Sequence, residues 1–124
     1  MKILLDTHAA LWWLADDPRF SDTAARHLTN AANQVYLSAV VVWEVAIKRS
    51  LGKLEAPPDF RATLLGGGAL PLPIDLEHAA RVEALSPHHR DPFDRLLIAQ
   101  AGLEGATLVT NDPAFSPYGV PILW

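Results

Sequence analysis

Four acidic residues stand at positions where their carboxylates can do chemistry together: Asp6, Glu44, Asp94 and Asp112. They belong to well-separated segments, and the elements expected around them bring them toward one edge of a sheet. Carboxylates crowded in a partly desolvated cleft repel one another, and either protonation at raised pKa values or a divalent cation relieves the repulsion. Oxygen-only ligands favour Mg²⁺ or Mn²⁺ over Zn²⁺. Such an ion can activate water against a phosphodiester and stabilise the leaving oxygen.

Three acids at the starts of expected helices also have a purely structural interpretation. Asp6 and Asp112 each follow an expected strand, where a carboxylate is a good N-cap for the next helix or turn. Asp91 precedes Pro92, which takes the favoured first helical position, so capping alone explains Asp91. We therefore rank Asp91 as a second-tier site residue.

Glu44 and Asp94 are harder to explain as surface charges. Glu44 is the only charge in the nine-residue window 39–47, and its structural alternative is an i, i+4 ion pair with Lys48. Asp94 belongs to a segment that is apolar on nearly every helical face, because apolar residues follow it from Leu96 to Leu103 with few interruptions. We expect both carboxylates to point inward.

The elements that must position these acids follow from apolar periodicity and from punctuation by proline, glycine and capping residues. Short apolar runs predict strands at 2–5, 35–37, 106–109 and 120–123, and a peripheral edge strand at 70–74, where two prolines remove ladder donors. Helical spacing predicts helices at 7–15, 21–32, 39–51, 75–85 and 91–104, another helical stretch between Pro58 and Gly66, and a turn or short helix at Asp112-Pro113.

Short apolar strands separated by helices indicate crossover connections and therefore a mostly parallel sheet. The predicted fold is a three-layer α/β/α sandwich. No internal repeat, low-complexity tract or linker interrupts the chain, so we expect residues 1–124 to form one domain. Ligands of such sheets bind beyond the carboxyl ends of the strands, where Asp6 and Asp112 are expected.

Composition excludes several classes of protein. The chain has 124 residues, no cysteine and a formal net charge of −4, which excludes disulfide scaffolds and thiolate zinc sites and argues against a wholly basic nucleic-acid-binding surface. The longest uncharged stretch, 28–43, is only 16 residues long and contains polar residues, so no membrane span is expected. The N-terminal apolar run is too short for a signal peptide, and the expected location is the cytoplasm. An apolar content of 50% suggests that a partner covers part of the surface.

Four segments carry a family resemblance. They are Leu4-Leu5-Asp6-Thr7-His8, Ser38 with Trp43-Glu44-Val45-Ala46, the run from Arg90 to Ala101 that contains Asp91-Pro92-Phe93-Asp94-Arg95, and Thr110-Asn111-Asp112. In this order and spacing they resemble the PIN-domain ribonucleases of the VapC toxin type, over essentially the whole chain. The resemblance implies a PIN-like fold and a Mg²⁺- or Mn²⁺-dependent endoribonuclease. It also implies inhibition by a cognate antitoxin and a homodimer.

Carried over by position, the resemblance makes Asp6, Glu44, Asp94 and Asp112 the family's acidic quartet, which acts in catalysis and metal binding. Thr110 matches a supporting hydroxyl, and Asp91 matches an acid common in this version of the third segment. Asn111 departs from the pattern, because many relatives have a basic or hydroxyl residue there. This departure concerns substrate contacts and leaves the metal ligands intact.

Positive charges near the acids are candidates for binding RNA phosphates. They are Lys48, Arg49 and Lys53 after Glu44, and Arg90 and Arg95 around the third segment. Their structural alternative is an ordinary solvated face with cations near a helix C-terminus. Trp12 and Trp13 point about 100° apart on a helix, so at most one can face a given ligand, and core or antitoxin contact explains them better. We assign no role to His8, His88 or His89.

Rival classes of function fit less well. A haloacid-dehalogenase-like phosphatase needs a second acid two residues after Asp6, where the chain has His8. A phosphoacceptor receiver domain needs an acid pair after its first strand and a lysine near its last, and no lysine follows Lys53. The remaining alternative is a PIN-like domain that binds RNA or a partner without cleavage.

Overall fold

A five-stranded parallel sheet lies at the centre of the computed structural model, which describes residues 1–124. The strand order is β3-β2-β1-β4-β5, and every pair of neighbouring strands is parallel. The strands are β1 (Lys2–Leu5), β2 (Gln34–Ser38), β3 (Leu70–Leu72), β4 (Thr107–Val109) and β5 (Ile122–Leu123). The predicted parallel sheet is confirmed, and the proline-containing strand lies at an edge, where its missing donors break no ladder.

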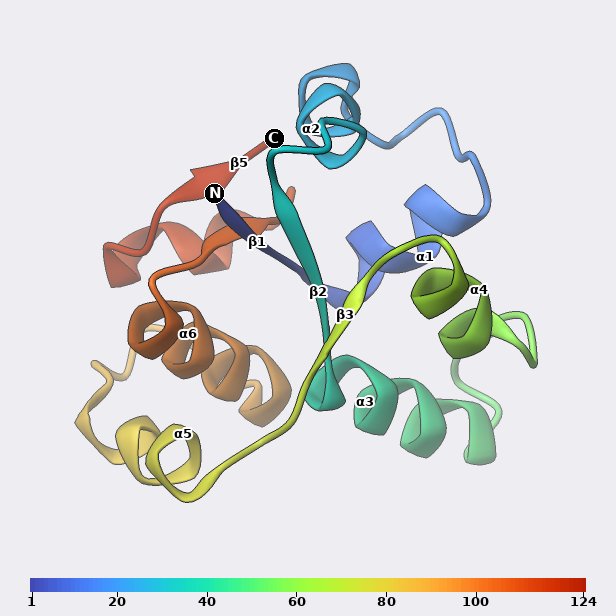
Figure 1. Cartoon of the computed structure of the whole chain (residues 1–124). Helices are drawn as coiled ribbons and strands as arrows, with labels where there is room; N and C mark the ends of the chain where they lie inside the picture. The colour runs from blue at the N-terminus through green and yellow to red at the C-terminus, as the bar shows by residue number, and fades with distance from the viewer.

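Helices flank the sheet on two sides, as Figure 1 shows, with α1 and α4 opposite α5 and α6. The helices are α1 (Thr7–Leu14), α2 (Asp22–Leu28), α3 (Ala39–Ser50), α4 (Phe60–Gly66), α5 (Leu76–Arg81) and α6 (Pro92–Glu104). Two short 3₁₀ helices, η1 (Val82–Ala84) and η2 (Pro113–Tyr118), complete the elements. This arrangement is the predicted α/β sandwich.

The hydrophobic core is built around the central strand. Ile3, Leu4 and Leu5 of β1 are at most 1% exposed, because β1 is covered on both faces and paired on both edges. Apolar side chains of α3, α6 and β4 pack into the same core. The central strand therefore holds Asp6, the next residue, in a fixed position at the carboxyl edge of the sheet.

Two predicted helices are shorter than expected. The helix predicted to run to Ala32 ends at Leu28, because the side chain of Asn33 donates to the His27 carbonyl at 3.0 Å and the side chain of Asn30 accepts from the Ala32 amide at 2.9 Å, which forms a turn. The helix predicted for 75–85 ends as α5 at Arg81 and tightens into η1.

No helix of the structure combines the length and the apolar character that crossing a membrane requires.

Candidate metal centre

Asp6 and Asp112 lie at the carboxyl ends of the neighbouring strands β1 and β4, and both also cap the elements that follow. Oδ1 of Asp6 accepts from the Ala9 amide at 2.7 Å, and Oδ1 of Asp112 accepts from the Ala114 amide at 2.9 Å. Each cap occupies one carboxylate oxygen. The capping and site interpretations are therefore compatible, because each carboxylate has a second oxygen.

Thr110 connects these two acids. Its hydroxyl accepts from the Asp112 amide at 3.0 Å, and Thr110 is 2% exposed. Burial raises the pKa of Asp6, while the side chain of Thr110 and the Ala9 amide lower it and the charge of Asp112 raises it further. Asp6 and Asp112 thus interact with each other, and both line a cleft of about 290 Å³.

Asp94, in the first turn of α6, lies near Asp112. We call the group of Asp6, Glu44, Asp94 and Asp112 the acidic edge. The side chain of Asp94 is 19% exposed, and Asp91 caps the helix by accepting from the Asp94 amide at 3.0 Å. Burial raises the pKa of Asp94 to about 6; the hydrogen bond with His89 opposes this, and the charges of Asp91 and Glu44 add to it. The structure thus places Asp94 among acids that repel it.

Glu44 points inward from α3 and is 5% exposed. Its Oε1 accepts from the Thr7 hydroxyl at 2.6 Å, and its Oε2 forms an ion pair with Lys48, the pair that the structural alternative expected. The hydrogen bond that Lys48 donates to Glu44 is the main reason why the pKa of Lys48 is raised, and the charges of Asp91 and Asp94 contribute as well. Glu44 is therefore both a partner of Lys48 and a member of the acidic edge.

His89 is the residue that our sequence interpretation missed. Nε2 of His89 lies 2.7 Å from Oδ2 of Asp94, and ligand atoms of His89, Asp94 and Asp112 all lie within 4.8 Å of one another. The available signal was the position of His88-His89 just before the helix that begins at Pro92 and carries Asp94. A side chain there reaches the same helix N-terminus as Asp94.

Arg95 and Tyr118 hold the segment that carries His89. The Arg95 guanidinium donates to four backbone carbonyls and to the Tyr118 hydroxyl, which also accepts from the His89 amide at 2.8 Å. The four carbonyls belong to Val82, Leu85, Ser86 and His89. These bonds explain the 3₁₀ turn of η1, and they make Arg95 a residue that positions His89.

The other cations that were predicted to bind RNA phosphates differ in how many bonds they already make within the chain. The guanidinium of Arg49 donates to the carbonyls of Ala56 and Pro57 at 3.0 and 2.7 Å and lies over the Phe60 ring, so it also serves the fold. Lys53 and Arg90 are exposed and form no ion pair or side-chain hydrogen bond within the chain. These two remain the candidates with the most freedom to meet a phosphate.

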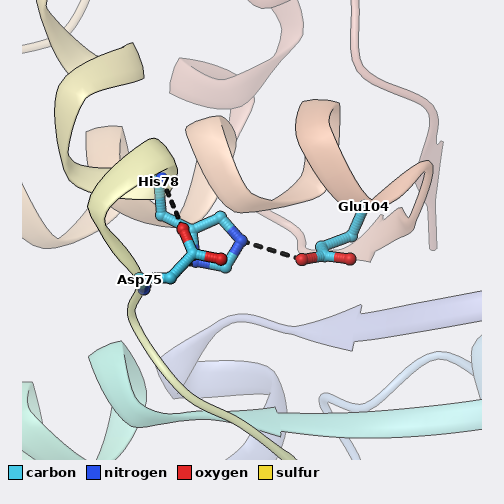
Figure 2. A group of neighbouring side chains, drawn as sticks. All are labelled: Asp75, His78 and Glu104. Carbon is cyan, nitrogen blue, oxygen red and sulfur yellow. Dashed lines mark hydrogen bonds and ion pairs between the residues drawn. The ribbon is translucent and has the colours of Figure 1, made fainter.

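A second group with metal-ligand geometry, Asp75, His78 and Glu104, lies where the N-terminal end of α5 meets the C-terminal end of α6 and is drawn in Figure 2. Nδ1 of His78 accepts from the Asp75 amide at 3.1 Å, which leaves the ring proton on Nε2, 2.9 Å from Glu104 Oε1. Both ring nitrogens are therefore occupied. We interpret this group as a capping box with a buried hydrogen bond rather than as a metal site.

The acidic edge, together with His89, has the donor set that a divalent cation requires: two carboxylates and an imidazole with neighbouring ligand atoms, and two more carboxylates, Asp6 and Glu44, beside them. Burial, and after it the charges of neighbouring acids, raise the pKa values of Asp6 and Asp94, so their charged forms are disfavoured unless a cation stabilises them. Fold and site together define an α/β protein with a candidate metal centre at the carboxyl edge of its sheet.

Comparison with known proteins identifies the family. A family model for the PIN domain matches residues 3–120, and a curated relative, "Ribonuclease VapC22" of Mycobacterium tuberculosis, is 31% identical over 89% of this chain and 86% of its own length. The chain therefore belongs to the PIN domain family, and the resemblance found in the sequence is confirmed.

Solved structures agree on the fold. One is a chain in the crystal structure of VapBC2 from Rickettsia felis bound to a DNA fragment from its promoter; it has a TM-score of 0.73 and 19% identity over 100% of this chain and 98% of that chain. Another belongs to DNA-bound VapBC from Salmonella typhimurium, with a TM-score of 0.72 and 21% identity over 99% and 97% of the two chains. At these identities the likeness concerns the fold.

Proposed function

We propose that this protein is a divalent-metal-dependent endoribonuclease and the toxin of a toxin-antitoxin pair. The observation that carries the proposal is the meeting of Asp94, Asp112 and His89, with Asp6 and Glu44 beside them, at the carboxyl edge of the sheet of a PIN domain. The curated relative, named a ribonuclease, supports the same reaction class.

In this proposal Asp6, Asp94 and Asp112 hold the cation, Mg²⁺ or Mn²⁺, with Glu44 behind them. The bound ion supplies activation of a water molecule and stabilisation of the leaving phosphate-ester oxygen. Thr7 and Lys48 fix the two oxygens of Glu44, so this carboxylate keeps its orientation. Thr110 keeps Asp6 and Asp112 together, and Asp91 caps the helix that carries Asp94.

RNA phosphates would approach this edge past exposed cations. Lys53 and Arg90 are free of partners within the chain, whereas Lys48, Arg49 and Arg95 are already bound to protein groups. The substrate proposal therefore relies mainly on Lys53 and Arg90 for long-range attraction.

An antitoxin and a second copy of the chain are the proposed protein partners. Support for the antitoxin comes from the VapBC structures whose fold this chain shares. Exposed apolar side chains supply surface for such contacts. They include Trp43 on α3, which is 46% exposed, and Leu76 on α5, which is 87% exposed.

Digestion of single-stranded RNA by the purified protein tests the enzyme proposal. We expect cleavage with Mg²⁺ or Mn²⁺ that stops when a chelator is added and resumes when the metal is restored. Cleavage that persists in chelator would contradict the metal mechanism. RNA binding without cleavage, in protein shown to be folded and metal-loaded, would favour the alternative of a PIN-like binding domain.

Expression in cells tests the toxin proposal separately. We expect growth arrest on expression, relieved by co-expression of the protein encoded beside this one. Growth arrest that no neighbouring gene product relieves, or normal growth with an active nuclease, would indicate a nuclease of another kind.

A further inference from the structure

Planar side chains, which we call the wall of the cleft, lie beside the acids Asp6 and Asp112. The cleft of about 290 Å³ that these acids line is completed by His8, Trp12, Arg19 and Asn111. An imidazole, an indole, a guanidinium and an amide thus share one small cleft with two carboxylates. None of these four side chains is needed to explain how the acids hold a metal.

The wall has a defined geometry. His8 and Trp12 lie one turn apart on α1 with ring centroids 5.7 Å apart and planes inclined by 33°. The Arg19 guanidinium lies over the Trp12 ring, 4.7 Å from its centroid. Trp124 contacts Trp12 at 5.9 Å and Phe20 at 5.3 Å, so aromatic packing holds the indole in place.

Arg19 is oriented before any ligand arrives. Its Nε and Nη2 donate to the two carboxylate oxygens of Asp17 at 3.0 and 2.8 Å, and its backbone amide donates to the same carboxylate at 2.9 Å. The remaining guanidinium nitrogen, Nη1, makes no hydrogen bond within the chain, and neither does the side chain of Asn111. Two polar groups that can recognise a ligand are therefore unused at the mouth of the cleft.

This set of groups matches an unpaired nucleobase. Bases of single-stranded RNA stack on aromatic rings and on guanidinium planes, and their edges are recognised by amide and guanidinium groups. His8 is exposed and the Arg19 side chain is 66% exposed, so both are accessible to a ligand. The carboxylates beside them are the residues expected to hold the metal ion, and an RNA phosphate would bind that ion.

We propose that His8, Trp12, Arg19 and Asn111 form a nucleobase subsite that binds an unpaired RNA base next to the phosphate that would bind the cation of Asp6 and Asp112. This inference rests on the proposed function, because it requires RNA at the acidic edge. Stacking on Trp12 and His8 supplies affinity for any base. Nη1 of Arg19 and the amide of Asn111 supply the preference among bases.

The test compares two ligands of equal charge. A fluorescently labelled short oligouridine and an oligomer of the same length made of abasic spacers are titrated, with Mg²⁺ present, against the Asp94→Asn variant, in which we expect too little cleavage to disturb the titration. We expect the oligouridine to bind at least about fivefold more tightly, because each stacked base contributes roughly 1 kcal/mol or more. Adding Trp12→Leu should abolish this ratio and leave binding of the abasic oligomer unchanged.

Matched variants guard against loss of folding. Trp43→Leu removes an exposed indole that lies outside the cleft, and it should preserve the ratio. His8→Ala and Arg19→Gln change exposed residues, so they test the wall without opening the core. Each should lower the ratio, and Asn111→Ala should instead change the relative affinities for oligouridine and oligoadenosine.

Photo-crosslinking gives a direct second measurement. RNA that contains 4-thiouridine should form adducts at His8 or Trp12 in the wild-type protein. Equal binding of the oligouridine and the abasic oligomer would overturn the subsite, as would an unchanged ratio in the Trp12→Leu variant or adducts confined to Trp43. If the wild-type protein still cleaves RNA in a metal-dependent way, these results leave the proposed function standing. Absence of any RNA cleavage or binding by the wild type would refute the proposed function itself.

Discussion

Helix α6 connects two polar clusters that look alike in composition but differ in chemistry. At its N-terminus, Asp94 meets His89 and Asp112. Farther along, Gln100 and Glu104 meet His78, and Figure 2 shows the bond between His78 and Glu104. Each cluster combines a histidine with carboxylates and includes a helix cap.

In the cluster around His78, which we call the inner cluster, the buried polar groups have hydrogen-bond partners. Gln100 is fully buried; its amide donates to the Pro73 carbonyl at 3.2 Å and contacts His78, and its carbonyl accepts from the Ser38 hydroxyl. His78 is 2% exposed with both ring nitrogens bonded. Hydrogen-bonded networks of this kind stabilise a fold and leave nothing for a ligand.

In the acidic edge, by contrast, the charges are not all paired. Carboxylates from separate elements repel one another, burial raises the pKa of Asp94 to about 6, and oxygens remain after the caps are made. Residues whose charges conflict in a cleft are characteristic of functional sites. Both clusters contain a histidine and carboxylates, so it is the unpaired charge of the acidic edge that distinguishes it as a candidate metal site.

The largest expected effect comes from Asp94→Asn. We expect RNA cleavage to fall by at least about a hundredfold, because replacing even the indirect partners of metal ligands costs roughly 10- to 100-fold. Thermal stability should stay level or rise, since the substitution removes like-charge repulsion. Asp75→Asn, which keeps a good N-cap in the inner cluster, is the matched control and should cleave normally. A variant of Asp94 that unfolds would favour a structural role for this residue.

The inner cluster should show the opposite behaviour. Gln100→Ala leaves buried polar groups unpaired and opens a cavity, so we expect a loss of about 2–4 kcal/mol in the free energy of unfolding. Urea titration measures this loss, and cleavage per folded molecule should be unchanged. Gln34→Ala, an exposed amide, should cost less than about 0.5 kcal/mol. Equal costs at the two positions would show that the buried network contributes little.

The pH dependence of stability sharpens the contrast further. Because the pKa of Asp94 is raised from 3.8 to about 6 in the folded protein, the native state binds this proton more tightly than the unfolded state does. In chelator, the free energy of unfolding should therefore fall as the pH rises from about 4 to about 6, by about 1 kcal/mol after allowance for solvent screening. Above about pH 6, Asp94 is charged in the folded protein, and the loss in the free energy of unfolding is complete.

Comparison with Asp94→Asn isolates this carboxyl from the other titrating groups. The wild-type protein and the variant are unfolded in urea across the same pH range, and their difference should shrink toward acid pH. Parallel curves for the two proteins would contradict the raised pKa of Asp94.

The smallest effect concerns phosphate attraction. Arg90→Ala, beside the acidic edge, should weaken RNA binding and reduce the slope of log affinity against log salt by about 0.7, the value for one phosphate contact on a single strand. Arg81→Ala, an exposed arginine of α5, is the matched control and should leave the slope unchanged. Equal slopes for both variants would remove Arg90 from the RNA path.

Much of the fold followed from local sequence signals. Asp91 caps its helix as predicted, Ser21 and Ser38 are the N-caps where two other predicted helices begin, and the edge position of β3 agrees with the prediction from the prolines of this segment. The errors lie at helix ends, where the deciding bonds come from side chains nearby or from a distant residue. Arg95 binds the carbonyls of Val82, at the start of η1, and of Leu85, just after its end, and no local pattern near residue 82 reveals that contact.

Local sequence patterns are enough to predict the order of strands and helices, and therefore which strand ends carry Asp6 and Asp112, because apolar periodicity and caps act over a few residues. The packing of the elements is what brings His89 to Asp94, binds Arg95 to backbone carbonyls, and places His8, Trp12 and Arg19 in one cleft with the acids. Those outcomes depend on distances between residues far apart in the chain, and distances of that kind exist only once the elements have packed.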